Sequence, residues 1–153
     1  MLQLTKRTEY GLIALVHMAD REGRFVSVRE LCERYPLPRR LLAEVLKDLN
    51  RSDLVESQRG AQGGYALAAS PDAITLAQVV EALEGAPALT SCRTLAPATG
   101  GNCEVEPTCP IRSPIHVIRE RLWKLMEVTT LRSLSQSGGA KTVAAELAST
   151  PSA

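Results

Sequence analysis

The sequence predicts a mainly α-helical fold with a single small β-hairpin. Five segments carry apolar residues every three or four positions, which is the spacing of a helix with one buried face. One further stretch, at 54–67, places two short runs around a glycine-rich turn and is typical of a hairpin. Of the 153 residues, 44% are hydrophobic but only 3% are aromatic, so we expect a core of leucine, valine, isoleucine and alanine.

The first three predicted helices follow one another closely in the N-terminal third of the chain. They cover 5–20, 27–35 and 38–52. Ser27 and Glu30 fit a capping box at the start of the second helix, and Pro36 must end it because proline cannot continue a helix. The third helix has one apolar and one polar face, so the second and third together predict a helix-turn-helix.

A predicted hairpin comes directly after the helix-turn-helix. Its strands lie at 54–59 and 65–67, and its turn at 60–64 is rich in glycine. Glycine allows positive φ angles and lets the backbone approach another surface closely. A hairpin in this position is the wing of a winged helix-turn-helix domain, which we expect to span 1–84 with a fourth helix at 75–83.

The C-terminal half combines an irregular stretch with a long helix. No helical or strand period is visible in 85–111, which we interpret as a functional loop because it holds three of the four cysteines. A helix at 113–129 has an apolar seam suited to a partner helix. The seam consists of Ile115, Ile118, Leu122, Leu125 and Met126. We therefore expect a dimerisation helix and a short following helix in 112–137, and a flexible tail at 138–153.

Composition narrows the possible functions. The formal net charge of +1 neither requires nor excludes nucleic acid. No run approaches the roughly 18 apolar residues of a membrane span, and 1–7 lack the apolar region of a signal peptide. We therefore expect a cytoplasmic protein with no membrane partner. No Ser/His/Asp set, phosphate-binding loop or paired-carboxylate motif is visible, so we do not expect an enzyme.

Three cysteines, Cys92, Cys103 and Cys109, form a cluster in the sequence that we call the cysteine triplet. In a cytoplasmic chain such cysteines are more often thiols, metal ligands or redox groups than structural disulfides. No CxxC pair is present, which disfavours zinc; thiolates also hold iron–sulfur clusters, and reactive or idle thiols are the alternative. Cys32 and His17 lie beside apolar stripes, so we expect both to be packed.

The third predicted helix carries the cations expected to contact DNA. Arg39 and Arg40 lie in its first turn, where a positive charge opposes the helix dipole, and this cost indicates an external partner. Arginine can bind a guanine edge or a phosphate with two hydrogen bonds. Lys47 and Arg51 are further candidates on this helix, as is Lys6 at the start of the first. Glu44 and Asp48 partly cancel the field of the third helix.

Several motifs resemble those of the Rrf2 family of bacterial transcriptional regulators. They are Leu4-Thr5-Lys6 with Tyr10, Leu54-Val55, Arg59-Gly60 and Gly63-Gly64-Tyr65, over roughly 2–137. The resemblance implies a homodimer in which crossed long helices carry two winged heads. It also implies binding to a pseudo-palindromic operator in double-stranded DNA, often as a repressor. The cysteine triplet is similar to that of the iron–sulfur branch of the family, in which the state of the cluster sets the DNA affinity.

The wing is expected to take part in DNA binding. Arg59 at its tip is predicted to enter the minor groove, whose narrow form attracts arginine. Gln62, Gly63 and Gly64 are predicted to offer backbone N–H groups to phosphate. An ordinary hairpin turn with one exposed arginine is the alternative.

The resemblance implies that the cysteine triplet holds an iron–sulfur cluster, [2Fe–2S] or [4Fe–4S]. Some relatives place a histidine ligand three residues after the third cysteine, but this position is Arg112, which cannot ligate iron in its charged form. Some relatives donate a carboxylate from the other subunit at the position of Glu9, so Glu9 is the expected fourth ligand, with His116 as the alternative.

Two other functions stay open on the sequence alone. One is a regulator of the same fold that carries no cluster and senses thiol oxidation or a small ligand. The other is a protein–protein module that modulates a metabolic enzyme. The second would show no salt-dependent DNA binding, because loss of affinity with salt is the mark of phosphate contacts.

Overall fold

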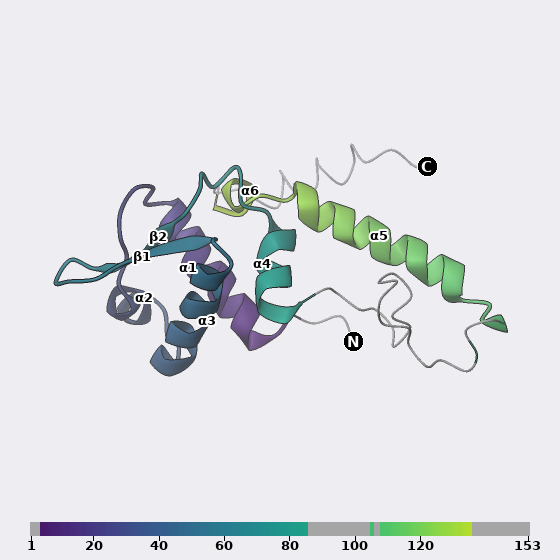
Figure 1. Ribbon diagram of the computed structural model, residues 1–153, viewed down its shortest axis with the longest axis horizontal. Helices are drawn as coiled ribbons and strands as arrows, with labels where there is room; N and C mark the ends of the chain where they lie inside the picture. Colours follow the sequence, from purple (N-terminus) through teal and green to yellow (C-terminus); the bar gives the residue numbers. More distant parts are fainter. Residues whose placement is uncertain (1–3, 86–104, 106–107, 136–153) are drawn as a thin grey trace.

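The computed structural model describes residues 4–85, 105 and 108–135. Its elements are α1 (Lys6–Ala19), α2 (Val28–Arg34), α3 (Arg39–Arg51), β1 (Val55–Gln58), β2 (Gly64–Leu67), α4 (Leu76–Glu84), α5 (Arg112–Val128) and α6 (Leu131–Ser135). Figure 1 shows α1 to α4 and the hairpin gathered into a head, from which α5 extends. This confirms the mainly helical fold with one antiparallel hairpin. None of the described helices is long and apolar enough to cross a membrane.

Helix α1 is the central element of the head. It packs against α3, α4, α6 and β2, and it begins at Thr5, whose side chain accepts a hydrogen bond from the Thr8 N–H at 3.4 Å. Gly11 lets two neighbours come close, because a Cβ atom there would lie 2.7 Å from Leu83 and 3.2 Å from Val45. The central position of α1 therefore depends on a residue without a side chain.

At the N-terminus of α2, only one of the two hydrogen bonds of the predicted capping box is present. The Ser27 hydroxyl accepts from the Glu30 N–H at 3.0 Å, as expected. The Glu30 carboxylate does not return the bond to Ser27. It lies 3.6 Å from His17 Nε2 and 3.8 Å from both Arg21 and Arg24. The physical reason is charge: two guanidinium groups from the segment between α1 and α2 lie near this carboxylate.

His17 and Cys32 are packed, as the sequence predicts. Only 2% of His17 is exposed, and its Nδ1 atom lies 3.1 Å from the Tyr35 hydroxyl and 3.3 Å from the Arg21 guanidinium. Burial, and then the charge of Arg21, lower the pKa of His17 below its usual value. Cys32 packs against the core of the head.

This burial of His17 is expected to make the stability of the fold depend on pH. The unfolded imidazole takes up a proton near pH 6.5, whereas the lowered pKa keeps the folded one neutral to a more acidic pH. Because protons then favour the unfolded state, the free energy of unfolding should fall as the pH drops below about 6.5. Urea unfolding at about pH 7.5 and about pH 5 checks this. The loss should be larger in the wild type than in His17→Gln, and equal losses would contradict it.

Helix α3 ends in a motif that the sequence did not reveal. Asp53 has a positive φ of 56°, its N–H donates to the Asn50 carbonyl at 3.2 Å, and the Leu54 N–H donates to the Leu49 carbonyl at 3.0 Å. These two bonds form a Schellman motif, which usually has glycine at the left-handed position. The motif turns the chain into β1 and buries Leu54, so it sets the direction in which the wing leaves the helix.

The wing is anchored to the loop between α1 and α2. Strands β1 and β2 pair antiparallel, with Val55 opposite Leu67 and Gln58 opposite Gly64. Val26 adds a bridge on the other side of β2, since its N–H donates to the Tyr65 carbonyl at 2.8 Å and its carbonyl accepts from the Tyr65 N–H at 2.9 Å. The sequence analysis did not anticipate this third short segment.

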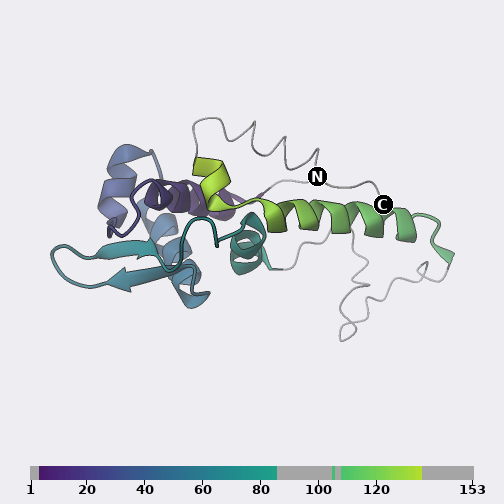
Figure 2. The same ribbon diagram turned by 90° about the horizontal axis from the view of Figure 1, so that it is seen from above.

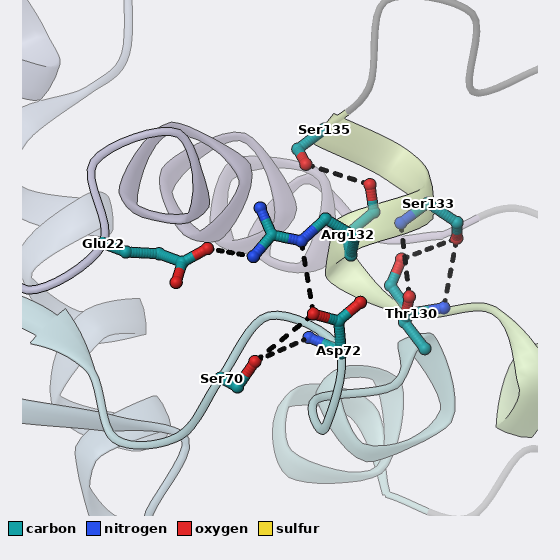
Figure 3. Close-up of polar contacts among 7 residues, drawn as sticks. All are labelled: Glu22, Ser70, Asp72, Thr130, Arg132, Ser133 and Ser135. Carbon is teal, nitrogen blue, oxygen red and sulfur yellow. Dashed lines mark hydrogen bonds and ion pairs between the residues drawn. The ribbon is translucent and has the colours of Figure 1, made fainter.

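Helix α6 is fastened to the head by Arg132 (Figure 3). Its guanidinium forms an ion pair with Glu22, which follows α1, and its Nε atom lies 3.3 Å from Asp72, in the turn before α4. Thr130 caps α6 by accepting from the Ser133 N–H at 3.2 Å. Figure 2 shows α5 leaving the head while α6 lies beside α1. The connection between α5 and the head is therefore held by charge as well as by packing.

Candidate nucleic-acid interface

Helix α3 has a buried face and a cationic face. Leu42, Val45, Leu46 and Leu49 are fully buried in the core of the head. The opposite side is exposed and carries four of the predicted cations. They are Arg39, Arg40, Lys47 and Arg51. The helix therefore presents its polar face outward, as the helix-turn-helix pattern predicts.

The cations of this face differ in how they are paired. Arg40, whose side chain is 95% exposed, lies 3.4 Å from Glu44 one turn along the same helix. Arg51 lies 2.9 Å from Asp48. Exposed pairs of this kind are weak, typically about 0.2–1 kcal/mol, and exchange readily for another anion. Among the described residues, Arg39 and Lys47 have no hydrogen bond or ion pair, which leaves them the most available cations of the helix.

The tip of the wing presents one cation and one exposed polar residue. Arg59 is exposed and has no ion pair within the part of the chain that the structure describes. Gln62 is exposed beside it, and Gly60 has a positive φ of 116°. Figure 1 shows this tip projecting from the end of the head opposite to α5. Arg59 and Gln62 are thus accessible to a partner that meets the tip of the wing.

The glycine pair of the wing lies close to the protein's own backbone. The Gly63 N–H donates to the Gly60 carbonyl at 3.0 Å, so it already has a partner within the turn. A Cβ atom at Gly63 would lie 2.3 Å from the Gln58 carbonyl oxygen, and one at Gly64 would lie 2.4 Å from the Val26 carbonyl oxygen. Both glycines therefore allow close contact with the protein's own backbone. The phosphate contacts expected of Gly63 and Gly64 stay a prediction.

Asn50 joins α3 to the wing and was missed by the sequence analysis. Its side-chain amide donates to the Val55 carbonyl at 2.8 Å, and its side-chain carbonyl accepts from the Ser57 hydroxyl at 3.4 Å. These bonds fix β1 relative to the last turn of α3. An asparagine in the last turn of a helix is a weak signal, because many surface asparagines occupy such positions, and only the fold identifies its partners.

The start of α1 is tied to the end of α4. The Glu84 carboxylate accepts from the Thr5 N–H at 2.8 Å. Desolvation opposes ionisation of Glu84, but hydrogen bonds from Thr8 and Thr5 outweigh it and lower its pKa. Lys6 forms an ion pair with Glu9, whose hydrogen bond and charge raise the pKa of the lysine. The Glu9 carboxylate is therefore already engaged within its own subunit.

The structure places only part of the predicted cluster site. Cys109 is half-buried just before α5, whereas Cys92 and Cys103 lie outside the described residues. His116, on the first turns of α5, has its Nδ1 atom 3.3 Å from Glu120. Within the described ranges, no group of three potential ligands comes together. The cysteine triplet and its fourth ligand, Glu9 or His116, stay predictions.

Helix α5 has no buried residue in the described part of the chain. Of the predicted seam, Ile118 is 49% exposed, while the other four members, Ile115, Leu122, Leu125 and Met126, are half-buried. Val117 and Val128 are similarly exposed and were not predicted. Helix α4 packs against α5, which explains why part of the seam is already shielded. Apolar side chains of α5 thus stay open to solvent at Val117, Ile118 and Val128.

A helix-turn-helix with a cationic outer face, a wing and a long apolar helix is also found in known proteins. Residues 4–137 match the Rrf2 family, described as iron-dependent transcriptional regulators. The chain belongs to the Rrf2 family. The match covers the head, the cysteine-bearing segment and both C-terminal helices, which is the range over which the sequence motifs resemble the family.

Solved structures of Rrf2-like regulators share this fold. The global cysteine regulator CymR (YrzC) of B. subtilis is 28% identical, and the match covers 88% of this chain and 97% of that one with a TM-score of 0.69. A putative transcriptional regulator from Listeria innocua is 26% identical, with coverage of 89% and 88% and a TM-score of 0.71. IscR of T. potens, 24% identical with coverage of 99% and 94% and a TM-score of 0.66, supports the fold.

Proposed function

We propose that this Rrf2-family regulator is a homodimeric, sequence-specific binder of double-stranded DNA that acts as a repressor. Helix α3 enters a major groove and the wing reaches the flanking minor groove. The observation that carries this proposal is the set of exposed cations without an internal partner among the described residues. They are Arg39 and Lys47 on α3 and Arg59 on the wing.

The proposed dimer follows from the open surface of α5. Exposed apolar patches on a protein surface mark interaction sites, and Ile118, Val117 and Val128 are all more than two-fifths exposed. A second copy of α5 offers a surface of the same chemistry, as two-fold symmetry requires. A two-fold dimer then reads a pseudo-palindromic operator, with one head on each half-site.

Loss of single cations on the DNA face should weaken binding in two distinct ways. Lys47→Ala should lower the affinity for all duplexes and reduce the slope of log affinity against log salt by about 1. Arg39→Ala should cost about 1–3 kcal/mol on a selected site and relax sequence preference at one position. Fluorescence anisotropy with a duplex selected from a random pool measures both. Lys124→Ala, on α5, is the control and should retain sequence preference and affinity, with at most a small change in the salt slope. Wild-type binding that does not depend on salt would instead support a protein–protein module.

The second part of the proposal is an iron–sulfur cluster that controls DNA affinity. The cysteine triplet would supply thiolates, and Glu9 of the other subunit would supply a hard, exchangeable ligand, with His116 as the alternative. The donor chemistry fits, and Cys109 lies half-buried next to α5, where a change can reach the dimer helix. Oxidation or loss of the cluster, [2Fe–2S] or [4Fe–4S], would then change the affinity of the protein for DNA.

The visible spectrum of protein purified without oxygen tests the cluster. Cys109→Ser should abolish or shift the cluster absorption, and Glu9→Ala should change it if Glu9 is a ligand. Cys32→Ser is the matched control, because Cys32 packs against the core and should leave the spectrum unchanged. An unaltered spectrum in Cys109→Ser would remove this residue from the ligand set.

A regulator without a cluster is the second candidate. The observation that favours it is the 28% identity to a protein described as a cysteine regulator. Such a regulator would sense a small ligand or thiol oxidation. It would stay colourless after anaerobic reconstitution with iron and sulfide, yet would still bind DNA with the salt dependence expected above.

A further inference from the structure

Asp48 connects Arg51, on the proposed DNA face of α3, to Arg7 on α1. One of its carboxylate oxygens, Oδ1, accepts from Arg51 Nη1 at 2.9 Å. The other, Oδ2, pairs with an Nη atom of Arg7, which belongs to α1. Asp48 is only 28% exposed and Arg7 only 36%, whereas Arg51 is 76% exposed. The carboxylate is therefore a bridge between α1 and α3.

Stability alone does not account for this bridge. Partly exposed ion pairs contribute little to folding, and α1 and α3 are already held together by the fully buried core. A carboxylate on a surface that binds phosphate has a cost, because it repels the DNA backbone. The other acidic residue on the outer side of α3, Glu44, contacts one arginine of its own helix at 3.4 Å. Asp48 differs from Glu44 in fixing side chains of two elements.

We infer that Asp48 is a positioning residue for DNA recognition, an inference that rests on the proposed DNA-binding function. It holds the Arg7 and Arg51 guanidiniums in place before DNA arrives. Each guanidinium has five N–H donors, so the donors not used by Asp48 stay available for phosphate. Ordering these side chains in advance lowers the entropic cost of binding at the correct site. The negative charge of Asp48 meanwhile weakens attraction to DNA of arbitrary sequence, so it raises the ratio of specific to non-specific affinity.

Asp48→Asn and Glu44→Gln separate positioning from charge. Both remove one negative charge from the outer side of α3 and keep the size of the side chain. Affinities are measured over a salt series for a duplex selected by the wild-type protein and for a scrambled duplex. Glu44→Gln should strengthen binding to both duplexes equally. Asp48→Asn should strengthen binding to the scrambled duplex only, so the specificity ratio falls by roughly five- to tenfold, the effect of leaving two long side chains unordered.

A third variant checks that Asp48 acts through Arg7. Arg7→Gln breaks the bridge from the side of α1 and should lower the specificity ratio as well, and adding it to Asp48→Asn should lower the ratio little further. Equal ratios for Asp48→Asn and Glu44→Gln would overturn the inference. A wild-type protein that selects no duplex at all would instead refute the proposed function. Thermal unfolding of each variant confirms that the compared proteins are folded.

Discussion

Replacing Ile118 with glutamate is expected to convert the proposed dimer into monomers and to lower affinity for a palindromic duplex by about two to four orders of magnitude. Ile118 is an apolar residue of α5 that is 49% exposed, and a charge there would have to be buried in the proposed dimer. Loss of the second head removes the gain from binding two half-sites together, which commonly reaches about 10²–10⁴. Sedimentation velocity and fluorescence anisotropy measure the two effects.

The matched control for this variant is Lys124→Gln. It shifts the net charge by the same amount on the same helix, but six residues away, on another face. It should remain a dimer and retain affinity for the palindrome apart from a small change in salt dependence. A dimeric Ile118→Glu protein would show that α5 does not form the interface.

Gly64→Ala is expected to have the second-largest effect, on both stability and binding. The added methyl group would lie 2.4 Å from the Val26 carbonyl oxygen, so the paired hydrogen bonds between Val26 and Tyr65 would have to lengthen. Overpacking of this kind typically costs about 1–3 kcal/mol, which corresponds to a fall in melting temperature of roughly 3–10 °C for a chain of this size. Because the same bonds anchor the wing, affinity for the selected duplex should fall as well.

Gly23→Ala distinguishes this contact from the general effects of replacing glycine. It changes the entropy of the unfolded chain in the same way, and it has open space around the new atom, with a positive φ of 75° as its only strain. It should destabilise less than Gly64→Ala and leave DNA binding intact. Equal losses in both variants would mean that the contact with Val26 does not limit the wing.

The boundaries of the head were largely predictable because they are set by local chemistry. Thr5, Ser27 and Thr75 each accept a hydrogen bond from the N–H three residues ahead, and Pro36 stops α2 as proline must. Such signals are contained within four or five residues, so a single sequence displays them. The buried face of α3 follows in the same way from its apolar spacing.

Features that depend on distant residues were not predictable. Glu30 was expected to complete a capping box, but the fold brings Arg24 and His17 to it and the carboxylate turns toward them. The bridge from Val26 to Tyr65 joins segments that are 39 positions apart. Sequence spacing identifies which side chains share a face, and only packing decides what covers that face.

In the candidate site, too, features set by local sequence were predictable and contacts between distant residues were not. The exposure of Arg39 and Lys47 followed from the two-faced pattern of α3. The pairing of Asp48 with Arg7 did not, because it depends on the distance between two helices that are far apart in sequence. The glycines of the wing were singled out for a close approach to another surface, and Gly63 and Gly64 lie close to the protein's own backbone. A glycine motif in the sequence predicts that another group comes close to the backbone, but it does not identify that group.

Because Arg132 attaches α6 to the head, a tilt of α5 would move the head with it. Helix α5 has 17 residues and is therefore about 25 Å long. Its C-terminal end is joined to the head by the bridge between Thr75 and Thr130 and by the ion pairs of Arg132. In the proposed dimer, a tilt of about 5° between two such arms would carry each head sideways by about 2 Å. Small adjustments where the two α5 helices cross would thus change the distance between the two α3 helices. That distance has to match the spacing of the two half-sites in the operator.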